Sequence, residues 1–242
     1  MEKSWNIGAT GEVLFKLYGT EQQQLILASI HSVWRRMEYA RLQYHDAKNL
    51  ADTYIDQNLK EKPLMFAIHG SDGGAENFND FIYRAGANIT AFTQNLHAVA
   101  DTFGHALYYA LDLKQSMDPL KEWKVDAGKV LIRLHRDPEL MNLADLLREM
   151  ISGSAFRHLT ALVNHSKHRA LVLASLTEDW TGQAPERHRL RLDDFVHNEK
   201  YYPAVDVTGF LSDEWNRVNK LCVDMGRELH TILQARLAAR LT

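Results

Sequence analysis

Apolar residues recur at alternating steps of four and three along two long stretches of the chain. The first stretch carries Ile26, Ile30, Val33, Met37, Ala40, Tyr44, Ala47, Ala51 and Tyr54. The second carries Phe78, Ile82, Ala85, Ile89, Phe92, Leu96, Val99, Phe103, Ala106, Ala110 and Leu113. Such steps place side chains on one face of an α-helix. The pattern therefore predicts two long helices that pack as an antiparallel pair.

Helix-capping and helix-breaking residues set the expected ends of the first long helix. Thr20 followed by Glu21 suits its start, because a hydroxyl can cap free N–H groups and an acid is favourable in the first turn. Pro63 is expected to end it, and the glycine-containing run at 70–74 predicts the connecting loop. The segment before this helix, residues 1–19, contains three glycines and a short alternating piece at 13–18. We interpret it as a short strand or an extended arm.

Shorter patterns follow the second long helix. Residues 117–138 read as a connector with a short helix near 129–134. Pro138 suits the first turn of a third helix, whose inward face is Leu140, Leu143, Leu147, Met150 and Ile151. Gly153 ends or kinks that helix, and Ser154 can cap a fourth that runs through residues 157–169.

The hydrophobic period then changes from helical to β-type. Runs at 171–176 and 190–196 predict a small β-hairpin inserted at about 170–197. Residues 201–203 read as a crossing loop, and Ser212 is expected to start the C-terminal helix. The sequence thus predicts a mainly α fold, a single helical-bundle domain over 1–242 with one hairpin insertion.

Composition excludes several classes of protein. The chain has 242 residues, of which 45% are hydrophobic and 24% charged, as in a folded globular protein. A net charge of −3 argues against a general nucleic-acid coat but allows a local basic patch. The single cysteine, Cys222, cannot form an intrachain disulfide. No apolar run approaches the ~20 residues of a membrane span, and the first residues lack the layout of a signal peptide, so a cytoplasmic location is expected.

Polar chemistry is densest between residues 157 and 169. On a helix, Arg157, Asn164 and His168 fall within a stripe about 40° wide, with His158 and His165 on the adjacent stripe. Together with Lys167, these side chains can form a cationic pocket for a phosphate, in which His168 acts as a general acid or base. The structural alternative is that they satisfy buried backbone groups where a helix turns into a strand.

A second polar group rises as one column on the second long helix. His97, Asp101 and His105 follow each other at intervals of four residues, on the side away from the heptad seam. In a catalytic site His97 and Asp101 would act together, because the carboxylate would orient the imidazole and raise its basicity. The three residues could instead hold a metal or form a solvated face. The sequence assigns neither a cofactor nor a metal.

Two resemblances arise at these residues. The segments 96–101 and 163–169 resemble a group of uncharacterised bacterial all-helical proteins, in which a helix with a His-x-x-x-Asp column precedes an Asn-x-x-Lys-His corner. The architecture also resembles the HEPN superfamily, helical bundles found among toxins and antiphage proteins, many of them metal-independent ribonucleases. The motif of that superfamily is an Arg, four to six residues, then a His on a helix. Seven residues separate Arg157 from His165, which is more than the motif has. Five separate Arg191 from His197, but this pair falls in the predicted hairpin and not on a helix.

Two functions follow from these patterns and resemblances. The first is action on RNA or a nucleotide phosphate, in a bacterial defence or toxin-type system, with His97 and Asp101 facing the stripe of Arg157, Asn164 and His168 across a shared cavity. The second is a non-catalytic interaction protein that forms a homodimer through its long helices within a larger assembly. Whether the protein is an enzyme stays open at this point.

Overall fold

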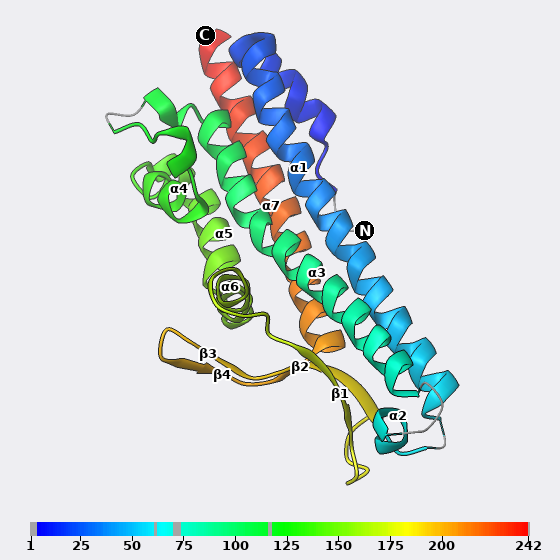
Figure 1. Cartoon of the computed structure of the whole chain (residues 1–242). Coiled ribbons are helices and arrows are strands. Elements are labelled where there is room, and N and C mark those ends of the chain that lie inside the picture. The colour runs from blue at the N-terminus through cyan, green and yellow to red at the C-terminus, as the bar shows by residue number, and fades with distance from the viewer. Residues whose placement is uncertain (1–3, 61, 70–73, 116–117, 242) are drawn as a thin grey trace. The chain divides into compact units, whose positions relative to one another are not determined.

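The computed structural model of the chain describes residues 4–60, 62–69, 74–115 and 118–241 (Figure 1). Contacts between residues divide the chain into two compact units. Unit 1 comprises residues 1–37, 96–157 and 216–242, and unit 2 comprises residues 38–95 and 158–215. Four helices contribute residues to both units: α1 (Ile7–Asn58), α3 (Gly74–Ala110), α6 (Ser154–His168) and α7 (Val207–Leu241).

The predicted mainly α fold is confirmed, and its two long helices are α1 and α3. Most residues of the two predicted seams are buried, and Ile26, Ile30 and Ile89, for example, are at most 2% exposed, whereas Tyr44, Phe78, Ile82 and Leu113 are half-buried. The pattern slips in the first turns of α3, where Phe81 is buried and the predicted Ile82 is only half-buried. Of the predicted loop at 70–74, residues 70–73 lie outside the described residues, and Gly74 already begins α3. Within the described ranges, no helix combines the length and the apolar character needed to cross a membrane.

The N-terminal segment in unit 1 differs from the prediction, because α1 already begins at Ile7. Asn6 accepts a hydrogen bond from the backbone N–H of Ala9 at 3.0 Å, which caps the first turn. Gly19 interrupts the helix with φ 79° and ψ −177°, so Thr20 does begin a new helical segment, as predicted. The two segments pack against each other, since Gln23 donates to the Gly11 carbonyl at 2.9 Å. The predicted strand or extended arm is therefore wrong.

The remainder of unit 1 follows the predicted order. After the short 3-10 turns η1 (Leu113–Gln115) and η2 (Glu122–Lys124) comes α4 (Ala127–Leu134), whose N-terminus is capped by Asp126. The predicted third helix is η3 (Pro138–Leu140) followed by α5 (Met141–Ser152). Gly153 separates α5 from α6, as the sequence indicates.

Unit 2 holds more β-structure than the predicted hairpin (Figure 1). Strand β1 (Ala174–Glu178) pairs antiparallel with β2 (His188–Leu192), which confirms the hairpin, and β2 also pairs with β5 (Val205–Asp206). The second predicted run, at 190–196, forms two strands instead of one. Its first part lies in β2, and its last part begins β3 (Phe195–His197), which pairs with β4 (Lys200–Tyr202) in a separate sheet. The interpretation of 201–203 as a crossing loop is therefore wrong for its first two residues. Unit 2 also contains the short helix α2 (Met65–His69), and α7 begins at Val207 rather than near Ser212.

The β3–β4 hairpin has a tight turn with two residues in a left-handed conformation. His197 pairs with Lys200, and the residues between them, Asn198 and Glu199, have φ values of 49° and 64°. Two-residue turns with positive φ at both positions match the twist of antiparallel strands, but glycine is favoured at the second one. Glu199 therefore holds a strained position at the tip of this hairpin.

Candidate functional site

The end of α6 and the β3–β4 hairpin form a cluster of basic side chains in unit 2. His165, Lys167 and His168 lie in the last turn of α6, and Arg169 follows directly. His165 is half-buried, whereas the other three are exposed. Positive side chains are favourable at a helix C-terminus, so this placement has a structural benefit of its own. We call these four residues and His197 of the hairpin the basic corner.

Two imidazoles meet inside the basic corner. The ring centroids of His165 and His197 are 5.9 Å apart, and His165 also packs against Phe195 at 5.3 Å. The Nδ1 atoms of both histidines are buried and have no hydrogen-bond partner among the described residues. A buried nitrogen without a partner costs free energy, which a ligand or a water could recover. The β3–β4 hairpin brings His197 to this site. The sequence pointed to His197 only through its spacing from Arg191.

The side chains that shift the pKa of His197 are all basic. Burial lowers the pKa of His197 below its ordinary value of 6.5, and Arg169, His165 and His168 lower it further. Like charges within reach of one another repel, and an anion between them would relieve that repulsion. The basic corner thus has the electrostatics of an anion-binding site.

His158 has a different environment from the rest of the predicted polar stretch. It is buried, and its ring contacts Phe195, Tyr202 and Phe210 at centroid distances of 5.5, 5.4 and 5.1 Å. Burial lowers the pKa of His158, which favours the neutral imidazole. Phe195 and Tyr202, opposite each other across β3 and β4, are stacked with centroids 5.0 Å apart. His158 therefore anchors the hairpin to α6 instead of facing a ligand.

The predicted partner column lies in unit 1, and each of its residues has a contact there. Asp101 accepts a hydrogen bond from the backbone N–H of Ala127 at 3.0 Å, which satisfies the first turn of α4. The His97 ring stacks on Phe156 with centroids 5.6 Å apart. His105 lies 3.0 Å from the Ser29 hydroxyl through its Nδ1. Within the described ranges, no three His, Cys, Asp or Glu side chains are grouped as metal ligands.

The predicted site residues thus divide between the units. His97, Asp101 and Arg157 belong to unit 1, whereas Asn164, His165, Lys167 and His168 belong to unit 2. Arg157 is exposed and donates to the backbone carbonyl of Ser152. Asn164 is half-buried in α6. Arg191 and His197, which have the spacing of the HEPN motif, both lie on strands, and Arg191 donates to the Ala204 carbonyl at 3.0 Å.

Comparison with known proteins adds no assignment. No family model, curated protein or solved structure matches the chain. A fold class alone does not determine function, so the function has to be argued from the site.

Proposed function

We propose that unit 2 binds RNA or a nucleotide phosphate at the basic corner. The observation that carries the proposal is the clustering of Lys167, His168 and Arg169 at the end of α6 near the contact between the His165 and His197 rings, and no acidic side chain contributes to the lowered pKa of His197. Cations that share no carboxylate are suited to phosphate oxygens. The resemblance to the HEPN superfamily points to the same class of ligand.

The paired imidazoles suit metal-independent cleavage of RNA. One neutral imidazole of the pair His165 and His197 would take the proton from a ribose 2′-hydroxyl, whose oxygen then attacks the phosphorus. The bond from phosphorus to the 5′-oxygen breaks, and the other imidazole, protonated, donates its proton to that oxygen. The products are a 2′,3′-cyclic phosphate and a 5′-hydroxyl. Lys167, His168 and Arg169 would stabilise the charge that develops on the phosphate.

Removing the exposed cations should weaken RNA binding. We expect the triple change Lys167→Gln, His168→Gln and Arg169→Gln to lower the affinity for a fluorescent single-stranded RNA by at least about tenfold at low salt. The slope of log affinity against log salt should become shallower by roughly 0.7 for each lost phosphate contact. Fluorescence anisotropy over a series of salt concentrations measures both quantities.

A matched control changes the same number of basic side chains elsewhere. Lys16, Lys60 and Lys62 are exposed, and changing all three to Gln should leave most of the affinity intact. Equal losses in the two triple variants would show that binding depends on net charge and not on the basic corner. Absence of RNA binding by the unchanged protein would overturn the proposal outright.

Changes at His165 and His197 should reduce RNA cleavage much more than RNA binding. We expect His165→Ala and His197→Ala each to reduce RNA cleavage by about 10² or more, while affinity for the RNA changes only a few-fold. Cleavage of a labelled oligonucleotide in the presence of a chelator measures the first effect. His31, which is exposed on α1, provides the control His31→Ala. Cleavage that survives both changes would assign binding, without catalysis, to the basic corner.

One observation favours the alternative of an interaction protein. The heptad seams are already buried within the chain, so a homodimer would have to use other apolar residues. Helix α2 exposes Met65, Phe66 and Ile68, at 58%, 59% and 39%. We propose this helix as the contact surface if the protein acts through association, and light scattering of Phe66→Ser against the unchanged chain tests it.

A further inference from the structure

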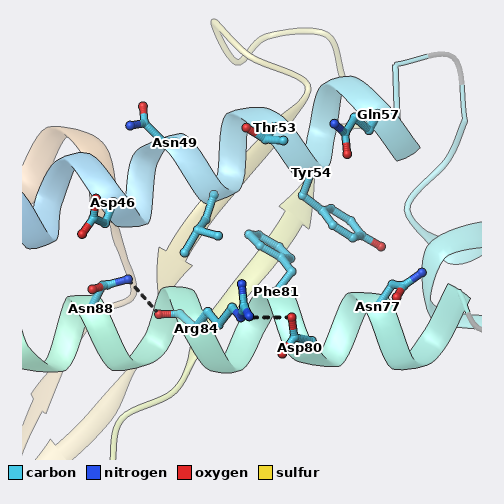
Figure 2. Close-up of a pocket in the computed structure, with 11 residues that line it drawn as sticks. Asp46, Asn49, Thr53, Tyr54, Gln57, Asn77, Asp80, Phe81, Arg84 and Asn88 are labelled. Atoms are coloured by element: carbon cyan, nitrogen blue, oxygen red, sulfur yellow. Dashed lines mark hydrogen bonds and ion pairs between the residues drawn. The ribbon is translucent and has the colours of Figure 1, made fainter.

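A groove of about 550 Å³, lined by both apolar and polar side chains, lies between α1 and α3 in unit 2, formed by residues separate from the basic corner (Figure 2). Its lining residues repeat at helical intervals on both helices, so each helix presents one stripe to it. From α1 come Asp46, Asn49, Leu50, Thr53, Tyr54 and Gln57, and from α3 come Asn77, Asp80, Phe81, Arg84 and Asn88. Figure 2 shows the rings of Tyr54 and Phe81 between the two helices, with polar side chains around them.

The floor of the groove is apolar and rigid. The Tyr54 and Phe81 rings are stacked with centroids 4.5 Å apart and an interplanar angle of 8°, and both residues are buried. Phe78 packs against Tyr54 at 5.8 Å and supports the stack from outside the lining. The two rings cover one face of each other, and together with Leu50 they give the groove an apolar floor.

The walls of the groove are rich in carboxamides. Asn49, Gln57, Asn77 and Asn88 each provide N–H donors and a carbonyl acceptor, and Thr53 adds a hydroxyl. Among the described residues, Asn88 donates to the Arg84 carbonyl at 3.2 Å, whereas the other four make no side-chain hydrogen bond. Their hydrogen-bonding capacity is therefore available to a ligand.

Helix stability does not explain these residues. Asn and Thr are poorer helix formers than Lys, Glu, Gln or Arg, because their short polar side chains compete with the helical backbone or lose rotamer freedom. Nearby on α1, Lys48 and Asp52 instead form an i,i+4 ion pair, which stabilises a helix. Asn49 and Thr53 stand at exposed positions inside α1, where they lower its stability without a side-chain hydrogen bond to another described residue in return. Asn77 is exposed in the first turn of α3.

The charges of the groove argue against an anionic ligand. Arg84 is paired with Asp80 at 3.1 Å, and Asp46 leaves the lining with a net negative charge. Many hydrogen-bonding groups without a free cation suit a neutral ligand that offers several hydroxyls. We propose that the groove binds a saccharide, whose hydroxyls the amides hold while its C–H groups lie on Leu50, Tyr54 and Phe81.

The test is binding of a defined panel to the full chain. Saturation-transfer NMR at millimolar concentration would compare maltotriose, cellotriose and N,N′,N″-triacetylchitotriose with adenosine and uridine. We expect at least one trisaccharide to bind and the double change Asn49→Ala and Asn77→Ala to weaken it by about tenfold or more. Gln94→Ala, an exposed amide on α3 outside the groove, should leave the affinity unchanged.

Thermal unfolding completes the design. The melting temperature of the double alanine variant should stay the same or rise, because alanine is the better helix former. A fall in melting temperature together with lost binding would give these amides a structural role and overturn the proposal. So would binding of the nucleosides alone, no binding by any trisaccharide, or unchanged affinity in the double variant.

Discussion

Replacing Gly226 with alanine is expected to destabilise unit 1 by about 3 kcal/mol or more. Gly226 lies within α7, and a Cβ added there would overlap the indole ring of Trp5, at Cδ2, Cε3 and Cε2. The ring would have to leave its place, where Trp5 is 8% exposed and packs on Phe103 with centroids 6.0 Å apart. The close approach of helix and ring thus requires glycine, although glycine is otherwise unfavourable in a helix.

Movement of Trp5 would also break a polar chain. The indole N–H donates to the Thr10 hydroxyl at 2.8 Å, and that hydroxyl lies 3.1 Å from Nδ1 of His230. Thr10 is fully buried, so its hydroxyl would lose a partner that water cannot easily replace. Urea unfolding followed by circular dichroism measures the loss as a change in midpoint at constant slope.

Two comparisons isolate the cause. Gly86 lies within α3, and a Cβ there would meet nothing within 4 Å, so Gly86→Ala should be neutral or stabilising by up to about 1 kcal/mol. In a Trp5→Ala background the cost of Gly226→Ala should largely disappear, because the overlapping ring is gone. Equal effects of the two glycine changes would contradict the proposed overlap.

The same contacts explain why the N-terminal segment could not be predicted. Gly8 and Gly11 weaken a local helical pattern, and the alternation at 13–18 resembles a strand. What decides the structure is burial at helical spacing, with Thr10, Leu14 and Leu17 on one face, and packing against residues distant in sequence. The long seams of α1 and α3 were predictable because nine and eleven apolar positions at alternating steps of four and three leave no competing period.

The candidate site was predictable to a similar extent. The basic residues at the end of α6 are local in sequence, so their clustering follows from helical geometry alone. The contribution of His197 depends on the turn at Asn198 and Glu199. This turn lacks the glycine that usually marks a two-residue hairpin in a sequence. The column of His97, Asp101 and His105 does share one helix face, but which groups pack on that face is a tertiary property, as the contact of Asp101 with Ala127 shows.

Loss of the Glu178 carboxylate is the second large effect that we expect, about 2–4 kcal/mol for Glu178→Ala. The side chain is 3% exposed and accepts hydrogen bonds from the Leu64 backbone N–H and from Arg187, both at 2.8 Å. It therefore joins β1 to the segment that leads into α2. Without it, the Leu64 N–H would lose its partner, and the buried His188, whose Nε2 lies 3.7 Å from the carboxylate, would lose a favourable neighbour.

The dependence of this effect on pH distinguishes charge from packing. Burial alone would raise the pKa of Glu178, but the Leu64 N–H and Arg187 outweigh it and hold the pKa below 4.5. A lowered pKa contributes stability that is fully present above 4.5 and is lost as the pH falls through the folded-state value. Glu178→Gln keeps the shape without the charge, so its free energy of unfolding should converge with that of the unchanged protein as the pH falls. Urea titrations at a series of pH values measure this, with the exposed neighbour Glu186→Gln as control, and a constant difference across that range would contradict the charged contact.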